Sequence, residues 1–415
     1  MPVYKDQTRV SEAFFAPLKT NLQSAVHLRH CPSLSDERWL SCGIKRVLGT
    51  YRSGRDFLQS LGAIGLSHFF ETLKSGRRLE LVSEVSAALA ANATELLPDA
   101  LAEYKELDKF EVFAGDGHYH EHACHDVRNG SSKRAIAHFF ALNLRSHTLG
   151  YLSLHDLEGR KKEHDMHMLK RLDVATLRQG TPTGKKVIWV WDKAGIDFRI
   201  WWKWKENNGI YFISLAKENM DLIPCGDKNY DRNDPINTGV ISDRLVGTSS
   251  GVMMREVVFE DIADGQVYRY ITSEMTLPPG LIALLYKMRW NIEKVFDQTK
   301  TKLAEKKAWA SSDNAKAMQA HFLCLAHNAL LLYEHTLVAE HGIEYHAENR
   351  RREKRHENKL ARMRQKGCHH GGIYQIIPAA TQRPLKFIRW LRACLQSGAS
   401  HAQALPQLQT LYASL

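Results

Sequence analysis

The spacing of hydrophobic and polar positions changes along the chain and separates a helical first part from a sheet-forming middle. Residues 1–100 predict helices: Ser35 is a residue type that caps a helix start, and residues 79–97 are rich in Ala, Leu, Glu and Val. From residue 109 onward, short apolar runs of strand length replace this pattern. They predict strands at 109–115, 134–142 and 149–154.

The next segment predicts the centre of a sheet. A polar helical stretch at 161–178 precedes the run 186–191, in which nearly every residue is apolar. Such a run is typical of a strand that is buried on both faces. A helical stretch at 195–207 and a strand at 211–215 follow. This order of strands and helices predicts a mixed α/β sheet.

Residues 218–275 interrupt that order. They begin with many Asn, Asp, Gly and Pro residues and continue with strand-like runs at 252–259 and 266–272. Asp264 and Gly265 between the two runs are typical of a hairpin turn. We interpret the segment as a β-rich insertion. Helices are expected after it at 281–302, 312–339 and 385–395.

These changes of pattern divide the chain into five predicted parts. They are a helical N-terminal region at 1–104, the first part of an α/β core at 105–217, the insertion at 218–275, the second part of the core at 276–340, and a basic helical C-terminal region at 341–415.

Composition narrows the class of protein. Apolar residues make up 44% and charged residues 25% of the 415 residues, which excludes a wholly disordered chain, a collagen-like repeat and a polytopic membrane protein. Seven cysteines without a CxxC pair predict neither a disulfide scaffold nor a zinc ribbon. The first residues lack the pattern of a signal peptide, and no apolar run reaches the ~18 residues of a membrane span. We therefore expect a soluble, cytoplasmic protein that makes no contact with a membrane.

The formal net charge of +11 is distributed unevenly. Residues 1–100 carry +2 and the insertion carries −6, whereas residues 350–366 hold nine basic and two acidic residues. Such a basic run is either a solvated helix or linker, or a contact for nucleic acid. Net charge alone therefore does not identify the function.

Two carboxylates follow predicted strands directly. Asp116 ends the first strand of the middle part, and Asp192 ends the buried strand at 186–191. Ligands of open α/β sheets gather beyond the carboxyl ends of strands, so a metal site is readily built there. The alternative is that each Asp caps a turn or the next helix.

The helix at 281–302 presents a polar stripe beside its apolar flank. At ~100° per residue, Tyr286, Arg289, Glu293 and Lys300 fall within an arc of about 60°. The flank that must face a core contains Leu281, Leu285, Met288, Ile292, Val295 and Phe296. A surface ion pair between Arg289 and Glu293 is the alternative, because residues four apart are neighbours on a helix.

This stripe resembles a signature of a known family. The spacing Tyr286-x2-Arg289-x3-Glu293-x6-Lys300 is similar to the Y-R-E-K signature of the DDE transposases of bacterial insertion sequences. The segment that Asp192 opens, DKAGIDF, and the later strand GIYFISLAK also resemble the surroundings of that family's second Asp. The resemblance covers about residues 105–340.

The resemblance implies a fold and a chemistry. The fold is a ribonuclease-H-like core, in which Asp116, Asp192 and Glu293 are catalytic and bind two Mg²⁺ ions, for which Mn²⁺ substitutes. Tyr286, Arg289 and Lys300 hold the DNA strand beside these ions. Two ions suit the reaction because they activate the attacking group and stabilise the leaving oxygen.

The resemblance also implies the partners. They are double-stranded DNA with terminal inverted repeats and target DNA, which a homodimer brings together in a synaptic complex. The enzyme cuts one strand at each end and directs the freed 3′-hydroxyl at the target. The helical region at 1–104 is then a candidate for binding DNA ends, and the protein associates with the bacterial nucleoid when it is bound to DNA.

One cluster departs from the family's pattern. His118, His120, His122, Cys124 and His125 crowd together after Asp116 and suggest a transition-metal site. The alternative, which we favour, is a polar loop or a surface that faces phosphate. The metallohydrolase arrangement HxHxDH is not met, because His122 stands where Asp is required. A His-dependent metallohydrolase, a ribonuclease-H-like nuclease without transposition and a non-catalytic DNA-binding derivative are the alternative functions.

Other residues have two interpretations each. Asp197 is a rival to Asp192 but lies past the strand. Trp201, Trp202 and Trp204 alternate with basic residues, so they either stack on unpaired bases or pack a helix against the sheet. Cys368 and its two following histidines are interpreted as a polar loop.

Overall fold

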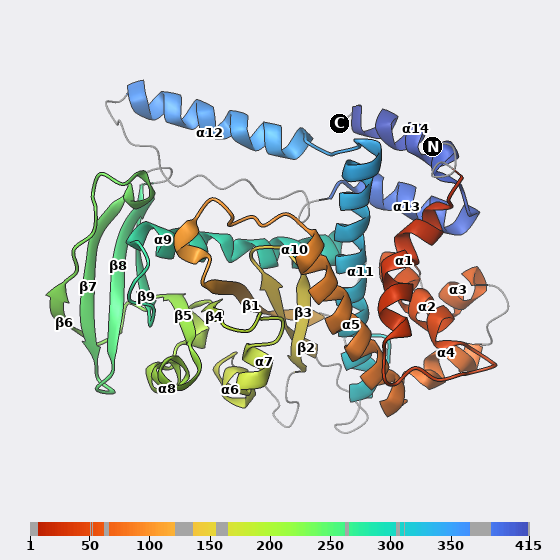
Figure 1. The fold of residues 1–415 in the computed structure, drawn as a ribbon, viewed down its shortest axis with the longest axis horizontal. Coiled ribbons are helices and arrows are strands. Elements are labelled where there is room, and N and C mark those ends of the chain that lie inside the picture. Colours follow the sequence, from red (N-terminus) through yellow and green to blue (C-terminus); the bar gives the residue numbers. More distant parts are fainter. Residues whose placement is uncertain are drawn as a thin grey trace.

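A nine-stranded sheet extends from the middle of the protein, at β3, to one end of it, at β6 (Figure 1). The computed structural model describes residues 7–49, 51, 53–61, 66–120, 136–154, 165–261, 265–303, 308–310, 312–365 and 383–413. The strand order is β3-β2-β1-β4-β5-β9-β8-β7-β6. The strands are β1 (Phe110–His120), β2 (Ile136–Asn143), β3 (Leu149–Leu154), β4 (Lys186–Val190), β5 (Ile210–Leu215), β6 (Leu222–Asp227), β7 (Val240–Thr248), β8 (Met253–Asp261) and β9 (Gln266–Thr272).

Strand direction divides the sheet into two parts. β1, β2 and β3 form an antiparallel meander, and β4 and β5 run parallel to β1. β9 joins β5 in antiparallel pairing and continues into the antiparallel strands β8, β7 and β6. The mixed α/β sheet is therefore confirmed, and the predicted insertion extends this same sheet.

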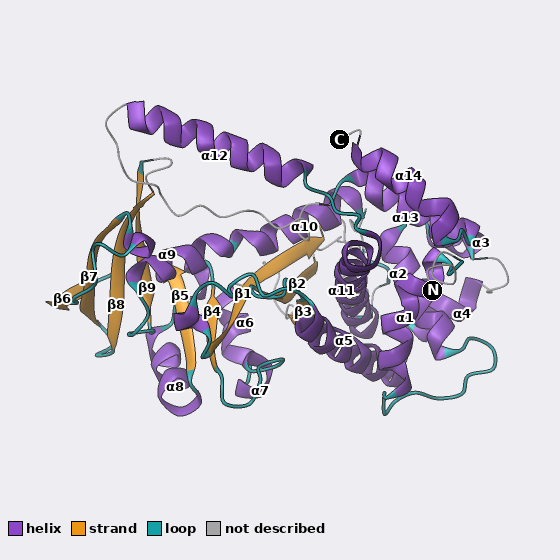
Figure 2. Cartoon of the chain, turned by 45° about the horizontal axis from the view of Figure 1, so that its top comes forward, coloured by secondary structure: helices purple, strands orange, loops and turns teal. Residues whose placement is uncertain are grey.

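Helices cover both faces of the sheet (Figures 1 and 2). α9 (Pro279–Met288) and α10 (Trp290–Lys302) cross one face, and α6 (Asp165–Arg171), α7 (Val174–Leu177) and α8 (Phe198–Asn208) lie on the other. The remaining helices are α1 (Val10–Gln23), α2 (Asp36–Leu48), α3 (Gly54–Ser60), α4 (Leu66–Thr72), α5 (Gly76–Leu96), α11 (Asp313–His341), α12 (Ala347–Gln365), α13 (Leu385–Ser397) and α14 (His401–Ala413).

The near-continuous apolar run at 186–191 is explained by these two layers. Ile188 and Val190 of β4 join the core beneath α9 and α10, whereas Val187 and Trp189 join the core beneath α8. Successive side chains of a strand point to opposite faces, so a strand between two helical layers is apolar throughout.

The Trp residues of α8 pack against the sheet. Trp201 and Trp204 are buried and stack on Phe212 of β5, with ring centroids 5.2 and 5.4 Å apart. Trp202 is exposed. The packing interpretation is thus confirmed for two of the three Trp residues.

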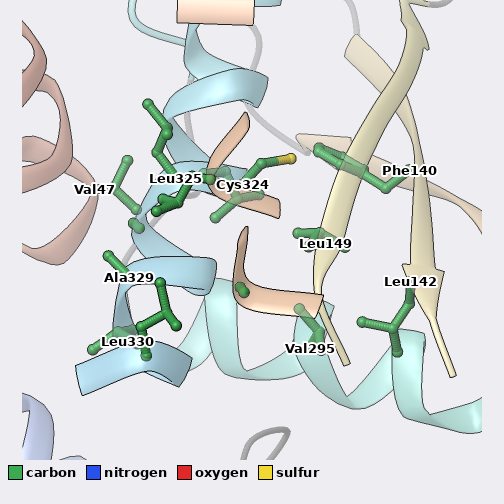
Figure 3. Packing of buried hydrophobic residues seen from close by; sticks show 14 of the residues in the cluster. Val47, Phe140, Leu142, Leu149, Val295, Cys324, Leu325, Ala329 and Leu330 are labelled. Atoms are coloured by element: carbon green, nitrogen blue, oxygen red, sulfur yellow. The ribbon is translucent and has the colours of Figure 1, made fainter. Parts of the chain in front are cut away.

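α11 covers the edge strand β3. Asn328 accepts a hydrogen bond from the Leu149 amide at 2.8 Å and donates one to the Leu149 carbonyl at 3.0 Å. Such cover prevents an edge strand from pairing with another chain. Figure 3 shows the apolar packing around α11, which lies between Val47 of α2 and the strand residues Leu149 and Phe140.

α11 also corrects the expectation that no stretch could span a membrane. By length and composition this one helix among the described residues qualifies, but 72% of its most apolar window is buried inside the protein. Such burial is typical of the central helix of a folded core.

The strands β7, β8 and β9, which lie in the predicted insertion, pair their charged side chains with one another. Arg255 of β8 pairs with Asp243 of β7 at 2.7 Å and with Glu274 at 3.5 Å. Glu256 pairs with Arg244 and Arg269 from the strands on either side. The acidic residues of this segment therefore serve in part to hold neighbouring strands together.

The predicted elements differ from the structure in several places. The predicted helix at 281–302 is broken at Arg289 into α9 and α10, and the predicted helix at 161–178 is two short helices. β6, β7 and α14 were not predicted. Ser35 accepts a hydrogen bond from the Arg38 amide and begins α2 as expected.

Candidate active site

The two aspartates lie at the same level of adjacent strands. Asp192 follows the end of β4, but Asp116 lies within β1, which continues to His120, so the prediction that Asp116 ends its strand is wrong. Ala114 of β1 pairs with Val190 of the parallel strand β4, so Asp116 and Asp192 each stand two residues beyond one pair. Neighbouring strands are ~4.8 Å apart, and residues two apart point to the same face. Ala114 and Val190 belong to the core beneath α9 and α10, so both carboxylates face the layer that contains Glu293.

Local hydrogen bonds fix both aspartates. The Asp192 carboxylate accepts a bond from the Ala194 amide at 2.7 Å, which caps a short 3-10 turn. Its backbone carbonyl accepts a bond from the Ser214 hydroxyl at 2.9 Å. The Asp116 carboxylate accepts the Gly117 amide at 2.8 Å. Capping thus occurs at Asp192, but it leaves other lone pairs of the carboxylate for a ligand.

Arg289 joins the third carboxylate to the first. Its guanidinium lies 2.8 Å from Glu293 and 3.7 Å from Asp116. The Arg289 side chain is 7% exposed, and those of Asp116 and Glu293 are 20% and 33% exposed. The predicted i,i+4 pair therefore exists, but it is part of a larger cluster at the sheet rather than a surface ion pair.

The cluster changes the ionisation of Asp116. Burial raises the pKa of the Asp116 carboxyl to about 7. Arg289 and the Gly117 amide oppose this increase, and the negative charges of Glu293 and Asp192 add to it. This mutual influence shows that the three carboxylates share one electrostatic environment.

Two further members of the signature differ in position. The Arg289 guanidinium lies over the Tyr286 ring, 5.6 Å from the ring centre. Burial raises the pKa of the Tyr286 hydroxyl. Lys300 lies on α10 roughly 10 Å beyond Glu293 along the helix axis. Among the described residues, none forms an ion pair with Lys300. The structure therefore brings Tyr286 and Arg289 to the carboxylates and leaves Lys300 two turns away.

The donor set fits a divalent cation. Carboxylate oxygens are the ligands that Mg²⁺ and Mn²⁺ prefer. In this structure the Arg289 guanidinium supplies the positive charge between Asp116 and Glu293. Within the described ranges, no three His, Cys, Asp or Glu side chains form a group that could hold a metal ion in this arrangement.

Two residues at the site were not predicted from the sequence. A Cβ on Gly115 would lie 2.4 Å from the ring of Trp191, so glycine lets the residues before Asp116 and Asp192 pack together. Trp290 follows Arg289 and is 52% exposed. On the helical wheel Trp290 is nearly opposite the apolar flank, a position that signals an exposed side chain.

Gly115→Ala tests this packing. The added methyl group must displace the buried Trp191 ring, so we expect a loss of roughly 1–3 kcal/mol in the free energy of unfolding. We also expect the activity that depends on the neighbouring Asp116 and Asp192 to fall as the stability falls. Urea denaturation measures the loss. Gly150→Ala in β3 is the control, because its nearest neighbour would be 3.9 Å away, and an equal loss there would contradict the explanation.

Other candidates from the sequence have structural roles or lie outside the described residues. His118 is buried in β1, with its ring centroid 4.8 Å from that of Phe296. His120 ends β1, but its side chain and residues 121–135, which include the rest of the His/Cys cluster, lie outside the described residues. Asp197 caps α8 and pairs with Lys170 at 3.5 Å. Cys368 also lies outside the described residues.

Comparison with known proteins adds a family to this geometry. The family model described as "Transposase DDE domain" matches residues 118–329, which is about half of the chain. The matched span contains Asp192 and Glu293 and begins two residues after Asp116. Comparison with curated proteins gave no match.

Proposed function

Because the chain belongs to the DDE transposase domain family, we propose that it cuts DNA at the ends of an insertion sequence and joins them to target DNA. The observation that carries this proposal is the convergence of Asp116, Asp192 and Glu293 on one face of the sheet. The family indicates a metal-dependent enzyme that acts on DNA, and these carboxylates are its proposed catalytic residues.

The strand order supports a ribonuclease-H-like core. The antiparallel meander β3-β2-β1 is followed by β4 and β5, which are parallel to β1. In this arrangement the first of the carboxylates lies within the central strand β1 and the second follows the neighbouring strand β4. The third is supplied by a helix that crosses the same face. We propose that β6–β9 are an insertion between β5 and this helix.

Asp116, Asp192 and Glu293 are the residues that would hold two Mg²⁺ ions, with Mn²⁺ as a substitute. The chemistry supplied by such bound ions is activation of water or a 3′-hydroxyl and stabilisation of the leaving oxygen. Asp116 must lose its proton to act as a ligand. Since its pKa is about 7, this loss occurs near neutral pH.

The signature residues position DNA in this proposal. Arg289 stays charged, because its acidic neighbours and Tyr286 raise its pKa against the effect of burial. To bind DNA, its guanidinium exchanges a carboxylate partner for a phosphate, which offers the same forked geometry. Tyr286 supports the Arg289 side chain from below, and Lys300 offers a point charge to a phosphate farther along the strand.

α12 is proposed as a second contact for DNA. Figures 1 and 2 show it extending from the end of α11 on the side of the molecule that holds α9 and α10. Apart from Ala347, its described side chains are exposed or half-buried, and most of them are charged. A helix without an apolar face gains little from packing, so a polyanion is a suitable partner.

Hydrogen exchange tests the role of α12. An isolated polar helix of this length is marginal in water, so we expect its amides to exchange fastest among the long helices. Added duplex DNA should slow the exchange at least tenfold, whereas the amides of α11 should not change. Slow exchange in the free protein that DNA leaves unchanged would contradict the proposed contact.

The partners complete the proposal. Two DNA ends with inverted repeats must be held together before joining, which implies a homodimer in the synaptic complex. The matching location is the cytoplasm, where the protein associates with the nucleoid when it is bound to DNA. Strand cleavage of duplex DNA that carries the element's own ends, with and without Mg²⁺, tests the function. Cleavage of any duplex irrespective of the ends would favour a nuclease without transposition.

A further inference from the structure

A basic cleft lies at the end of α10, the helix that contains Glu293 and Lys300. Its volume is about 770 Å³, and it is enclosed by α2, α3, the last turn of α10 and α13. The cleft joins the N-terminal helices to the C-terminal region across the end of α10. The charged side chains that line it are Lys45, Asp56, Lys302, Arg389 and Arg392.

Hydrogen bonds hold the walls of this cleft together. Arg392 of α13 donates to the Leu48 carbonyl at the end of α2 and, at 2.7 Å, to the Lys302 carbonyl at the end of α10. Lys302 in turn donates through its ammonium group to the Arg383 carbonyl. Three segments far apart in the sequence are thus connected by charged side chains, so the cleft is present before any ligand binds.

The other two cations are available to a ligand. No described residue forms an ion pair with Lys45 or Arg389. Arg389 is exposed, whereas Lys45 is half-buried and its ammonium lies 5.9 Å from the centre of the Phe15 ring. Burial lowers the pKa of Arg392, and the positive charge of Arg389 lowers it further. Like charges held this close repel each other, and an anion in the cleft relieves the repulsion.

The position of the cleft relates it to the proposed active site. Lys302 follows Glu293 by nine residues on α10, which places the cleft roughly 13 Å from the carboxylates along the helix axis. A DNA duplex advances ~3.4 Å per base pair. The cleft is therefore about four base pairs away from a phosphodiester at the carboxylates.

We propose that this cleft binds the phosphate backbone of the DNA duplex beside the cleavage site, through Lys45 and Arg389. The proposal rests on the proposed function only in taking DNA as the substrate. It assigns a substrate contact to the N-terminal helices and to α13 at once. The volume suits a stretch of backbone rather than one small ion.

The test is the salt dependence of duplex binding by the full chain carrying both Lys45→Gln and Arg389→Gln. A 30-base-pair duplex of arbitrary sequence is used as the probe, in EDTA so that no strand is cut. Each lost phosphate contact reduces the slope of log K against log salt by about 0.9. We expect the slope to fall by about 1.8 and the affinity at 0.1 M salt to fall at least tenfold.

Two matched variants make the result decisive. Lys45→Arg with Arg389→Lys keeps both charges and should keep the wild-type slope. Lys105→Gln with Lys109→Gln removes two exposed charges just before the start of β1, outside the cleft, and should leave the slope unchanged. All variants should stay close to the wild-type melting temperature, since Arg389, Lys105 and Lys109 are exposed and Lys45 is half-buried.

An unchanged slope in the Lys45/Arg389 variant would overturn the proposal, as would an equal decrease in the Lys105/Lys109 variant. Either result would leave the proposed catalytic carboxylates unaffected, because binding in EDTA does not depend on them. Conversely, evidence against the catalytic role of the carboxylates would not change the slopes that we expect for DNA binding.

Discussion

Glu293→Gln is expected to abolish DNA strand cleavage while leaving the protein folded. The substitution keeps the size of the side chain and its hydrogen bond to Arg289, but it removes the negative charge that a divalent cation requires. We expect cleavage to fall by about 10³-fold or more, which corresponds to roughly 4 kcal/mol of activation free energy. Single-turnover cleavage of a labelled duplex in Mg²⁺ measures the effect.

Asp297→Asn is the matched control for this experiment. Asp297 lies one turn after Glu293 on α10 and is exposed. Removing its charge should change the cleavage rate less than threefold. Normal cleavage by the Glu293→Gln variant would show that the DDE interpretation of this site is wrong.

Asp116→Asn is expected to make the metal-free protein more stable at pH 8 and catalytically inactive. The wild-type carboxyl has a pKa of about 7 in the folded protein, above the value of 3.8 for the free side chain. Above pH 7 the folded protein contains an ionised carboxylate that is partly buried beside Glu293 and Asp192. The neutral amide removes this cost, which is roughly 1–4 kcal/mol.

The pH dependence has a definite sign. From about pH 4 to pH 7 the folded protein retains a proton on Asp116 that the unfolded chain has lost. The free energy of unfolding of the wild type therefore falls as the pH rises through this window. The advantage of Asp116→Asn should be small at pH 4 and largest at pH 8.

Urea denaturation in EDTA at pH 4, 6 and 8 measures this difference. Asp108→Asn, in the loop before β1, is the control, because Asp108 is exposed and lies outside the carboxylate cluster. A wild type that becomes more stable from pH 4 to pH 8 relative to Asp116→Asn would contradict the proposed environment of Asp116.

The sequence predicted the elements whose pattern is local. The strands β1, β4 and β5 and the helix α11 have apolar positions at the spacing that their burial requires, so each could be read without knowing its neighbours. β7 was missed because it carries Asp243 and Arg244 in its interior. Their partners, Arg255 and Glu256, belong to the next strand, and only the paired sheet shows that these charges are satisfied.

Only the part of the candidate site that depends on local spacing was predicted from the sequence. The helical wheel placed Arg289 beside Glu293, and this contact is present. The approach of Arg289 to Asp116 depends on how α10 crosses the sheet, which no local pattern contains. The close packing of Gly115 on Trp191 likewise joins two strands that are far apart in the sequence.

The basic C-terminal region shows what charge could and could not predict. The excess of Lys and Arg at 350–366 predicted a solvated helix or a nucleic-acid contact, and α12 is a largely exposed helix. The cations at the cleft are one residue each from α2 and α10 and two from α13. They form a cluster only in the folded protein, so a count along the sequence does not detect them.

Strand-cleavage mapping on DNA with the element's own ends tests the central claim most directly. We predict that purified protein in Mg²⁺ or Mn²⁺ cuts one strand at the boundary of each end, leaves a 3′-hydroxyl and joins it to added target DNA. EDTA should abolish every product. Cleavage that persists in EDTA, or the absence of any cut at these boundaries with active, folded, metal-supplied protein, would contradict the claim.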